Sequence, residues 1–290
     1  MTAPGLTKAP GLVRAPRFLA APGRLGTAGT ASAVVLAIAV FAAVFGPWLA
    51  PDNPDLPNLQ IAWVGPAAGH LLGFDFEGRD VLSRLLAGAQ SAMLGPLVVV
   101  MLAMAGGAVF ALIGAWRRGA TDAVISSGMD ILFAFPGILL AVLATTVFGA
   151  GLTAAAVALS IAYLPYVARV LRAGALRERN QPYVQALEVQ GATAARICLA
   201  HILPNMSRVI VAQATVLFGD AMVDLAAISF LGLGVQPPAA NWGVMISENE
   251  LGILQGYPLS ALAPGFAIVI VVIAFNVLGE RLFEQAQGAR

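Results

Sequence analysis

Charge is what this sequence has least of: Asp, Glu, Lys and Arg make up only 11% of its 290 residues, whereas an ordinary soluble domain carries about 25%. Hydrophobic residues account for 59% of the chain. This balance excludes a typical water-soluble fold. The net charge of +1 is spread over short segments and gives no basic patch, so nucleic acid is not a predicted partner.

Cysteine, lysine and histidine are also scarce. The single cysteine, Cys198, excludes an internal disulfide and is expected to be a small buried apolar residue. The single lysine, Lys8, is followed by Ala9, so the chain lacks the Gly-Lys-Ser/Thr sequence that binds ATP phosphates. His70 and His201 are predicted on opposite sides of a membrane, so no metal site is predicted. No nucleophile has a recognisable base, and no catalytic residue is predicted.

Long apolar runs are abundant. A helix that crosses a hydrocarbon core of about 30 Å needs about 20 apolar residues, and six stretches approach that length: 31–50, 91–116, 131–149, 152–170, 209–230 and 261–279. The runs are continuous rather than alternating, which favours helices over barrel strands. The sequence therefore predicts an all-α membrane protein of about six transmembrane helices. Pro96, Pro136 and Pro165 are expected to kink their helices.

The basic residues predict the orientation of these spans. Fourteen fall on one side of the predicted membrane: Lys8, Arg14, Arg17, Arg24, Arg117, Arg118, Arg169, Arg172, Arg177, Arg179, Arg196, Arg208, Arg281 and Arg290. Only Arg79 and Arg84 fall on the other side. Since cytoplasmic loops carry the excess of Lys and Arg, both termini are predicted to be cytoplasmic. A cleaved signal peptide is the competing interpretation of the first 50 residues, but their apolar run exceeds the usual 7 to 15 residues.

The predicted organisation has four parts. Residues 1–30 are a flexible cytoplasmic tail rich in Ala, Pro and Gly, and residues 31–50 are the first transmembrane helix. Residues 51–90 form an extracytoplasmic loop that is too short for a separate enzymatic domain. Residues 91–290 form one transmembrane domain, which includes a cytoplasmic loop at 171–208.

The most informative segment is YVQALEVQGATAARICLAHILPN, residues 183–205 of that cytoplasmic loop. Val184, Leu187, Gly191, Ala194 and Cys198 recur at steps of three and four, which predicts a helix with one small apolar ridge. Such a helix docks either onto the protein's own spans or into a groove of a partner; the alternative is a re-entrant or interfacial helix with no partner. The glycine weakens the helix and indicates a bend or a close approach.

The same segment resembles the cytoplasmic loop motif of ABC importer permeases, which has a Glu-Ala-Ala triplet, a Gly four residues after it and a closing Leu-Pro pair. Gln185, Ala186 and Leu187 stand at the triplet, so two of its three positions differ, and Glu188 lies nearby as a substitute carboxylate. The glycine is Gly191, and the closing pair is Leu203 and Pro204.

Three further segments are similar to the dipeptide, oligopeptide and nickel branch of that family, and to its second permease subunit. They are HLLGFDFEGRDVLSRLLAGAQ at 70–90, MDILFAFPGILLAV at 129–142 and ISFLGLGVQPPAANWG at 228–243. The resemblance covers about residues 51–284, with its four segments in the order and topology of that branch.

The resemblance implies a type I ABC importer permease fold in the inner membrane of a bacterium. It implies a second homologous permease, two ATP-binding cassette domains that hold ATP and Mg²⁺, and an extracytoplasmic substrate-binding protein. This chain would bind no cofactor of its own. The ATPase contact would be made by Gln185, Ala186, Leu187, Glu188 and Gly191, and His201, Leu203 and Pro204 would fix where the loop rejoins the bundle.

Residues along the substrate pathway are predicted from intramembrane charge. Asp220 and Asp224 lie four apart on one face of the fifth span, and carboxylates are costly in a membrane. They would contact a peptide's α-amino group, unless Asp224 lies in the outer membrane–water interface, where placing a charge costs little free energy.

In the outer loop, Gly78, Arg79, Asp80 and Arg84 form a candidate contact with the binding protein. The structural alternative has Asp80 capping a helix and Arg84 pairing with Glu77 or Asp80. Trp242 is expected in the aromatic belt of the membrane interface.

Function is thus predicted as peptide import by alternating access, driven by separate ATPases, with nickel or another small solute as the alternative cargo. A secondary transporter would show two related halves with broken helices, and a channel would show a filter or a ring of charge. Neither pattern is evident in the sequence, but both classes stay open.

Overall fold

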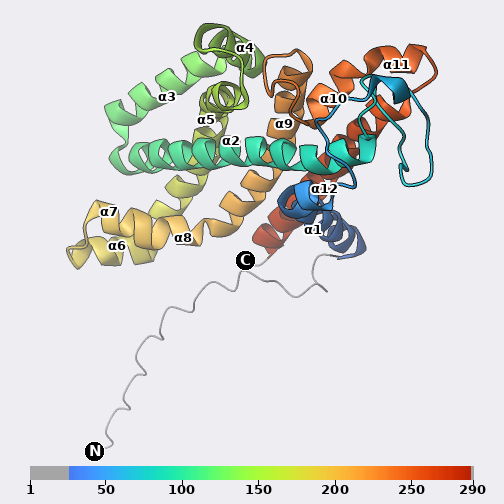
Figure 1. The fold of residues 1–290 in the computed structure, drawn as a ribbon. Helices are drawn as coiled ribbons and strands as arrows, with labels where there is room; N and C mark the ends of the chain where they lie inside the picture. Colours follow the sequence, from blue (N-terminus) through green and yellow to red (C-terminus); the bar gives the residue numbers. More distant parts are fainter. Residues whose placement is uncertain (1–25, 289–290) are drawn as a thin grey trace, which may run out of the picture.

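The computed structural model describes residues 26–288 and the side chains of residues 26–284, and the chain is helical almost throughout. Figure 1 shows its elements. They are α1 (Gly26–Leu49), η2 (Leu59–Ile61), α2 (Val81–Arg117), α3 (Gly119–Phe133), α4 (Gly137–Phe148), α5 (Leu152–Arg179), α6 (Pro182–Val189), α7 (Ala194–Ile197), η3 (Cys198–Ile202), α8 (Leu203–Asn205), α9 (Ser207–Phe230), α10 (Trp242–Glu248), α11 (Glu250–Leu254) and α12 (Leu259–Gly288). The predicted all-α class is confirmed.

Five of the described helices, α1, α2, α5, α9 and α12, are long and apolar enough to cross a membrane, and the pair α3 and α4 makes a sixth span if it is counted as one. The prediction of about six spans is therefore confirmed. A single helix over 131–149 is wrong, because α3 ends at Phe133 and α4 starts at Gly137, with a bend of 78° between them. Pro136 causes this break: it has no N–H to donate, and it disfavours helical geometry in the residue before it.

Several helices extend beyond their predicted spans. α2 begins at Val81 rather than at residue 91 because the Asp80 carboxylate caps it, accepting the Ser83 N–H at 2.7 Å. α5 continues to Arg179, so the first nine residues of the predicted loop 171–208 are helical. α1 starts at Gly26, within the predicted tail 1–30, and the rest of that tail lies outside the described residues.

The long helices approach one another closely through small residues. A Cβ at Gly107 of α2 would lie 2.5 Å from Cγ1 of Val167 in α5, and a Cβ at Gly46 of α1 would lie 2.1 Å from the Leu86 carbonyl oxygen of α2. Buried alanines fill much of the core of the bundle: Ala89, Ala103, Ala111, Ala115, Ala168 and Ala175. Such packing is how helices associate in a membrane, where apolar burial alone gives no driving force.

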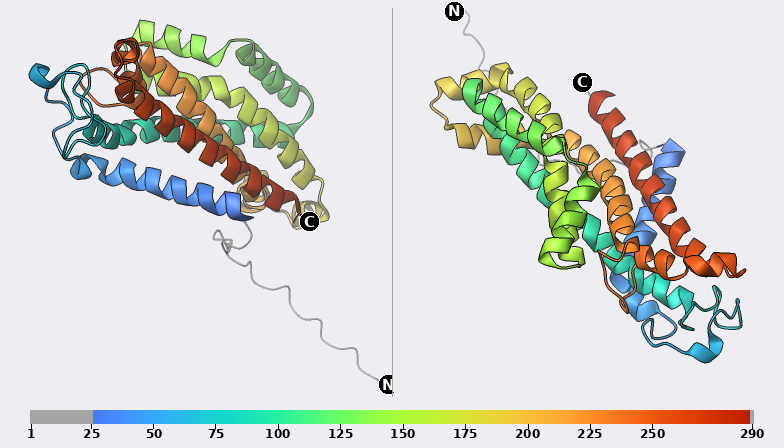
Figure 2. Two further views of the ribbon diagram at one scale, coloured as in Figure 1. Left: turned by 90° about the vertical axis from the view of Figure 1, so that its right-hand side faces the viewer. Right: turned by 90° about the horizontal axis from the view of Figure 1, so that it is seen from above.

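The two ends of the bundle differ. Figure 1 shows α6, α7 and α8 near one end of α2, and α10, α11 and the loop that precedes α2 near the other. In Figure 2, α1 and α12 run side by side, and the described end of α12 lies toward the α6–α8 end. The segments that the charge pattern assigned to opposite sides of the membrane therefore lie at opposite ends of the molecule.

Candidate functional site

The loop between α5 and α9 folds into two short helical segments rather than one helix. α6 starts with Pro182 at its first position, where no N–H is needed, and ends at a turn in which Gly191 has φ +79°. The Gly191 N–H donates to the Glu188 carbonyl and the Ala192 N–H to the Leu187 carbonyl, both at 3.0 Å. These two bonds form a Schellman motif, which favours glycine at the left-handed position.

The single continuous ridge predicted for this loop is therefore wrong. Val184 and Cys198 are buried, and Leu187 is half-buried, but they belong to different segments. Gly191 is exposed, and a Cβ added to it would meet nothing within 4 Å, so the bend was predicted correctly and the close approach was not. The reason is that the left-handed turn at Gly191 ends α6 before Ala194 and Cys198 are reached.

The other candidate residues of this loop divide between its two faces. Gln185, Ala186 and Glu188 lie exposed on α6. Beside them Val189 is 89% exposed. His201 and Leu203 are half-buried where the loop returns to the bundle, and Pro204 is exposed in α8. Pro204 has no N–H for the helical ladder, and the preceding turn, η3, is a π-helix in which the Leu203 N–H donates to the Cys198 carbonyl.

Polar side chains tie this loop to the bundle. The Tyr183 hydroxyl donates to Glu178 at 3.0 Å and accepts from the Asn205 side chain at 3.1 Å, and burial raises the pKa of Tyr183. Arg179 donates to the Ala115 carbonyl at 2.7 Å and to the Trp116 carbonyl at the end of α2, and lies 4.5 Å from the Trp116 ring centroid. Sequence reasoning used this arginine only as a topology marker and missed its contacts.

One of the two carboxylates of α9, Asp224, has a partner that the sequence did not reveal. Asp220 is exposed and Asp224 is half-buried, and the Tyr163 hydroxyl of α5 donates to Oδ2 of Asp224 at 2.7 Å. Gln213 lies seven residues before Asp220 on the same face of α9, and its buried Nε2 has no hydrogen-bond partner among the described residues. Asp224 lies six residues before Phe230, about 9 Å along the helix.

At the opposite end, the outer-loop candidates Gly78, Arg79, Asp80 and Arg84 are all buried. The prediction that these four residues directly contact a binding protein is therefore wrong, because all four are buried within the molecule. Gly78 packs so tightly that its Cβ would lie 1.9 Å from the Asn58 carbonyl oxygen.

Arg79 and Arg84 belong to a buried ion network. Arg79 contacts Asp75 at 2.7 Å, Glu77 at 2.8 Å and Glu248 at 3.1 Å. Arg84 contacts Glu248 at 2.9 Å and Asp75 at 3.5 Å, so its predicted pairing with Glu77 or Asp80 is wrong. Burial raises the pKa of Glu248, and the two arginines act in the opposite direction. Glu248 was missed because it lies 164 residues from Arg84, a distance that no local pattern spans.

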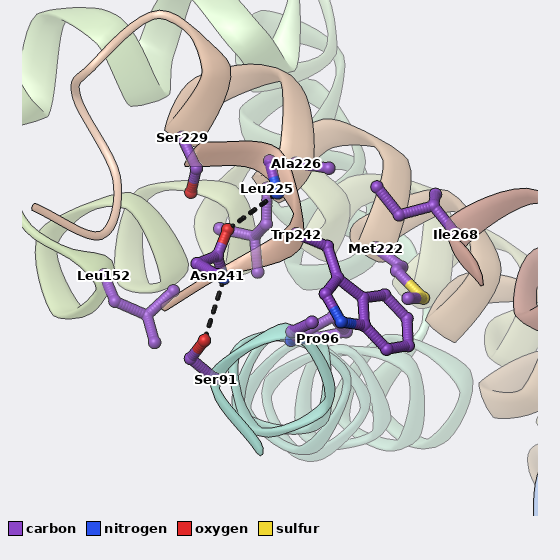
Figure 3. Close-up of a pocket in the computed structure, with 12 residues that line it drawn as sticks. Ser91, Pro96, Leu152, Met222, Leu225, Ala226, Ser229, Asn241, Trp242 and Ile268 are labelled. Atoms are coloured by element: carbon purple, nitrogen blue, oxygen red, sulfur yellow. Dashed lines mark hydrogen bonds between the residues drawn. The ribbon is translucent and has the colours of Figure 1, made fainter. Parts of the chain in front are cut away.

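A narrow, mostly apolar cavity lies where α2, α9 and α10 meet, with the polar side chains of Ser91, Ser229 and Asn241 in its wall (Figure 3). The Asn241 side chain donates to the Ser91 hydroxyl at 3.0 Å and accepts the Gly243 N–H at 3.0 Å. Trp242 is buried, and its indole donates to the Leu85 carbonyl at 2.9 Å. The prediction of Trp242 in an aromatic belt is therefore wrong, since this side chain joins α10 to the start of α2.

The chain resembles known transport proteins over most of its length. Residues 103–286 match the family described as binding-protein-dependent transport system inner membrane component. A dipeptide transport system permease protein of Escherichia coli is 40% identical over 255 residues, covering 86% of this chain and 85% of that protein. A di/tripeptide transport system permease protein of Pseudomonas aeruginosa is 36% identical over 253 residues, covering 85% and 83%.

A solved structure resembles the fold. The inward-facing MetNI methionine ABC transporter aligns with a TM-score of 0.57 and 20% identity, covering 70% of this chain and 96% of the matched chain. The predicted ABC importer permease fold is thus confirmed.

Proposed function

Since this chain belongs to the family of binding-protein-dependent transport system inner membrane components, we propose that it is one of two permease subunits that form the pathway of a bacterial peptide importer. Its partners are a second homologous permease, an extracytoplasmic binding protein and two ATPase domains that hold ATP and Mg²⁺. Both termini lie on the cytoplasmic side of the inner membrane. The names of the relatives from Escherichia coli and Pseudomonas aeruginosa support a di- or tripeptide as cargo.

The ATPase docks on α6. The observation that carries this proposal is the division of the loop: Val184 is 1% exposed on the inner side while Val189 is 89% exposed on the outer side. An exposed apolar residue beside Gln185, Ala186 and Glu188 gives a short helix face that fits a groove of a partner. Closure of the ATPases would then move α6, and through it α5 and α9.

Gly191 gives the sharpest test of this coupling, with ATP hydrolysis and peptide uptake measured together in proteoliposomes that contain the whole transporter. Gly191→Asn, which tolerates a positive φ, is expected to behave like the wild type. Gly191→Ala strains the turn by about 1 kcal/mol, and Gly191→Trp adds bulk in the open space at the docking face.

We expect only the Trp variant to hydrolyse ATP without matching uptake. Its ratio of peptide uptake to ATP hydrolysis should be at least tenfold lower than that of the wild type. Equal losses in the Ala and Trp variants would locate the effect in the turn rather than in docking. Unchanged uptake in the Trp variant would contradict docking at this surface.

Asp220 and Asp224 line the substrate pathway and pair with the α-ammonium group of the peptide. The exposure of Asp220 and the hydrogen bond from Tyr163 to Asp224 support this assignment, because intramembrane carboxylates are retained where they face a cavity or a partner. Replacing each aspartate by Asn should reduce the preference for a free over an N-acetylated dipeptide by about tenfold, or 1.4 kcal/mol.

Tyr163→Phe is the control for this test, since it removes the hydrogen bond and keeps both carboxylates. An unaltered preference in the double Asn variant would refute the role of the two aspartates in substrate recognition.

A further inference from the structure

Three potential metal ligands converge in the outer loop, and two of them, Asp52 and His70, belong to no site described above. Asp52 lies three residues after the end of α1, His70 lies in the middle of the loop, and Asp80 caps α2. Oδ2 of Asp52 is 3.3 Å and Oδ1 of Asp80 is 3.1 Å from Nδ1 of His70. The three ligand atoms all lie within 4.8 Å of one another.

The negative charge of this cluster favours binding of a cation. Two carboxylates are directed at one imidazole nitrogen, which carries at most one hydrogen and so cannot give each of them a full hydrogen bond. The basic residues of the same loop do not neutralise these two carboxylates, because Arg79 and Arg84 contact Asp75, Glu77 and Glu248 instead. A cation bound between the three ligand atoms would balance the two negative charges.

Surrounding groups hold the ligand atoms in place. The Ser83 hydroxyl accepts the Asp52 N–H at 3.0 Å and donates to Oδ2 of Asp80 at 2.7 Å. Oδ2 of Asp80 is thereby occupied, and Oδ1 is left to face His70. Paired backbone hydrogen bonds with Ala67 fix His70, and its ring lies 4.5 Å from that of Phe74. Bonds of this kind orient ligands at metal centres in proteins.

We propose that Asp52, His70 and Asp80 bind a zinc-class divalent cation. Ligand atoms about 2.0–2.1 Å from a tetrahedral zinc lie about 3.3–3.4 Å apart, close to the two distances at His70, and zinc accepts imidazole and carboxylate ligands. The side chains of Asp52 and His70 are 51% and 28% exposed, which leaves the fourth position to water. Bound zinc would join the end of α1 to the start of α2. Sequence reasoning predicted no metal site because it compared only the two histidines.

The test measures zinc binding to the full-length chain in its purified transporter complex, with an affinity tag that contains no histidine. Zinc chloride competes with a chromophoric chelator for the wild type and for the variants Asp52→Asn, His70→Gln and His201→Gln. Asp52 is exposed, so its variant keeps the fold even if His70→Gln does not. His201→Gln is the matched control, because it removes the chain's other histidine, which lies in η3.

We expect one zinc per chain, an affinity at least tenfold lower in Asp52→Asn and His70→Gln, and no change in His201→Gln. Zinc should also raise the thermal unfolding temperature of the wild type and not that of Asp52→Asn. Wild-type protein that binds no zinc, or zinc retained with equal affinity in Asp52→Asn, would overturn the assignment and leave a hydrogen-bonded His–Asp cluster.

Discussion

Replacing Arg84 by Met is expected to destabilise the outer end of the bundle severely. The Arg84 side chain is fully buried and donates to the Pro54 and Pro238 carbonyls at 3.1 and 3.3 Å in addition to Glu248. Methionine fills much of the same space but leaves Glu248 with Arg79 as its remaining cation. Removing one partner of a buried ion pair costs about 3–5 kcal/mol.

Protonation of Glu248 limits this cost. One pKa unit corresponds to about 1.36 kcal/mol, so protonating at pH 7 a glutamate with an ordinary pKa near 4.3 costs about 3.7 kcal/mol. Burial already raises the pKa of Glu248, and Arg84 opposes that shift, so the variant should raise it further. Between pH 4.3 and the raised pKa the folded state binds more protons than the unfolded state, and stability falls as pH rises. The penalty of Arg84→Met should therefore be larger at pH 7.5 than at pH 5.

Unfolding of the detergent-purified complex at both pH values measures this effect. Arg281→Met is the matched control, because Arg281 and Glu284 are 44% and 55% exposed, and an exposed pair contributes about 0.2–1 kcal/mol. Equal stability losses in the two variants, or a penalty for Arg84→Met that does not change with pH, would refute the reasoning about the buried network.

Two further predictions concern packing and the cysteine. Gly46→Ala places a Cβ 2.1 Å from the Leu86 carbonyl oxygen and should lower the stability to thermal unfolding by about 1–3 kcal/mol. Gly128→Ala in α3 is the control, because its Cβ meets nothing within 4 Å and the change should be neutral or stabilising. Equal effects of the two variants would contradict the α1–α2 contact. Burial raises the pKa of Cys198, which lowers its thiolate fraction at pH 7. Iodoacetamide should therefore alkylate Cys198 more slowly in the folded chain than in the denatured chain, and the rate should rise with pH. Equal alkylation rates in the folded and denatured chains would refute the burial of Cys198.

The sequence predicted the spans well because lipid imposes length and apolarity on every crossing helix. It failed where a single residue changes local geometry. Pro136 breaks the third span, and the Asp80 cap starts α2 ten residues early. Gly191 divides the cytoplasmic loop by adopting φ +79°. A capping residue or a proline can be recognised in sequence, but whether the surrounding bundle accommodates it depends on packing.

The candidate sites were predicted only in part. The α9 carboxylates were found from their spacing, but Tyr163 comes from another helix, 61 residues away from Asp224. The outer arginines were found as a motif, but Arg84 was given the wrong partners, since Glu248 lies far along the chain. His70 was set aside as a ligand because the carboxylates beside it, Asp52 and Asp80, are brought there by the tertiary fold. Residues joined by long-range contacts leave no periodic signal in a single sequence.

We propose above that this chain is the conduit of a peptide importer driven by separate ATPases. The most direct measurement is uptake of a radiolabelled dipeptide into proteoliposomes that contain this chain, its permease partner, the ATPases and the binding protein. We expect uptake that requires ATP and ceases when the ATPase partners carry a substitution that abolishes hydrolysis. Uptake that persists with inactive ATPases would contradict this proposal and indicate a secondary transporter or a channel.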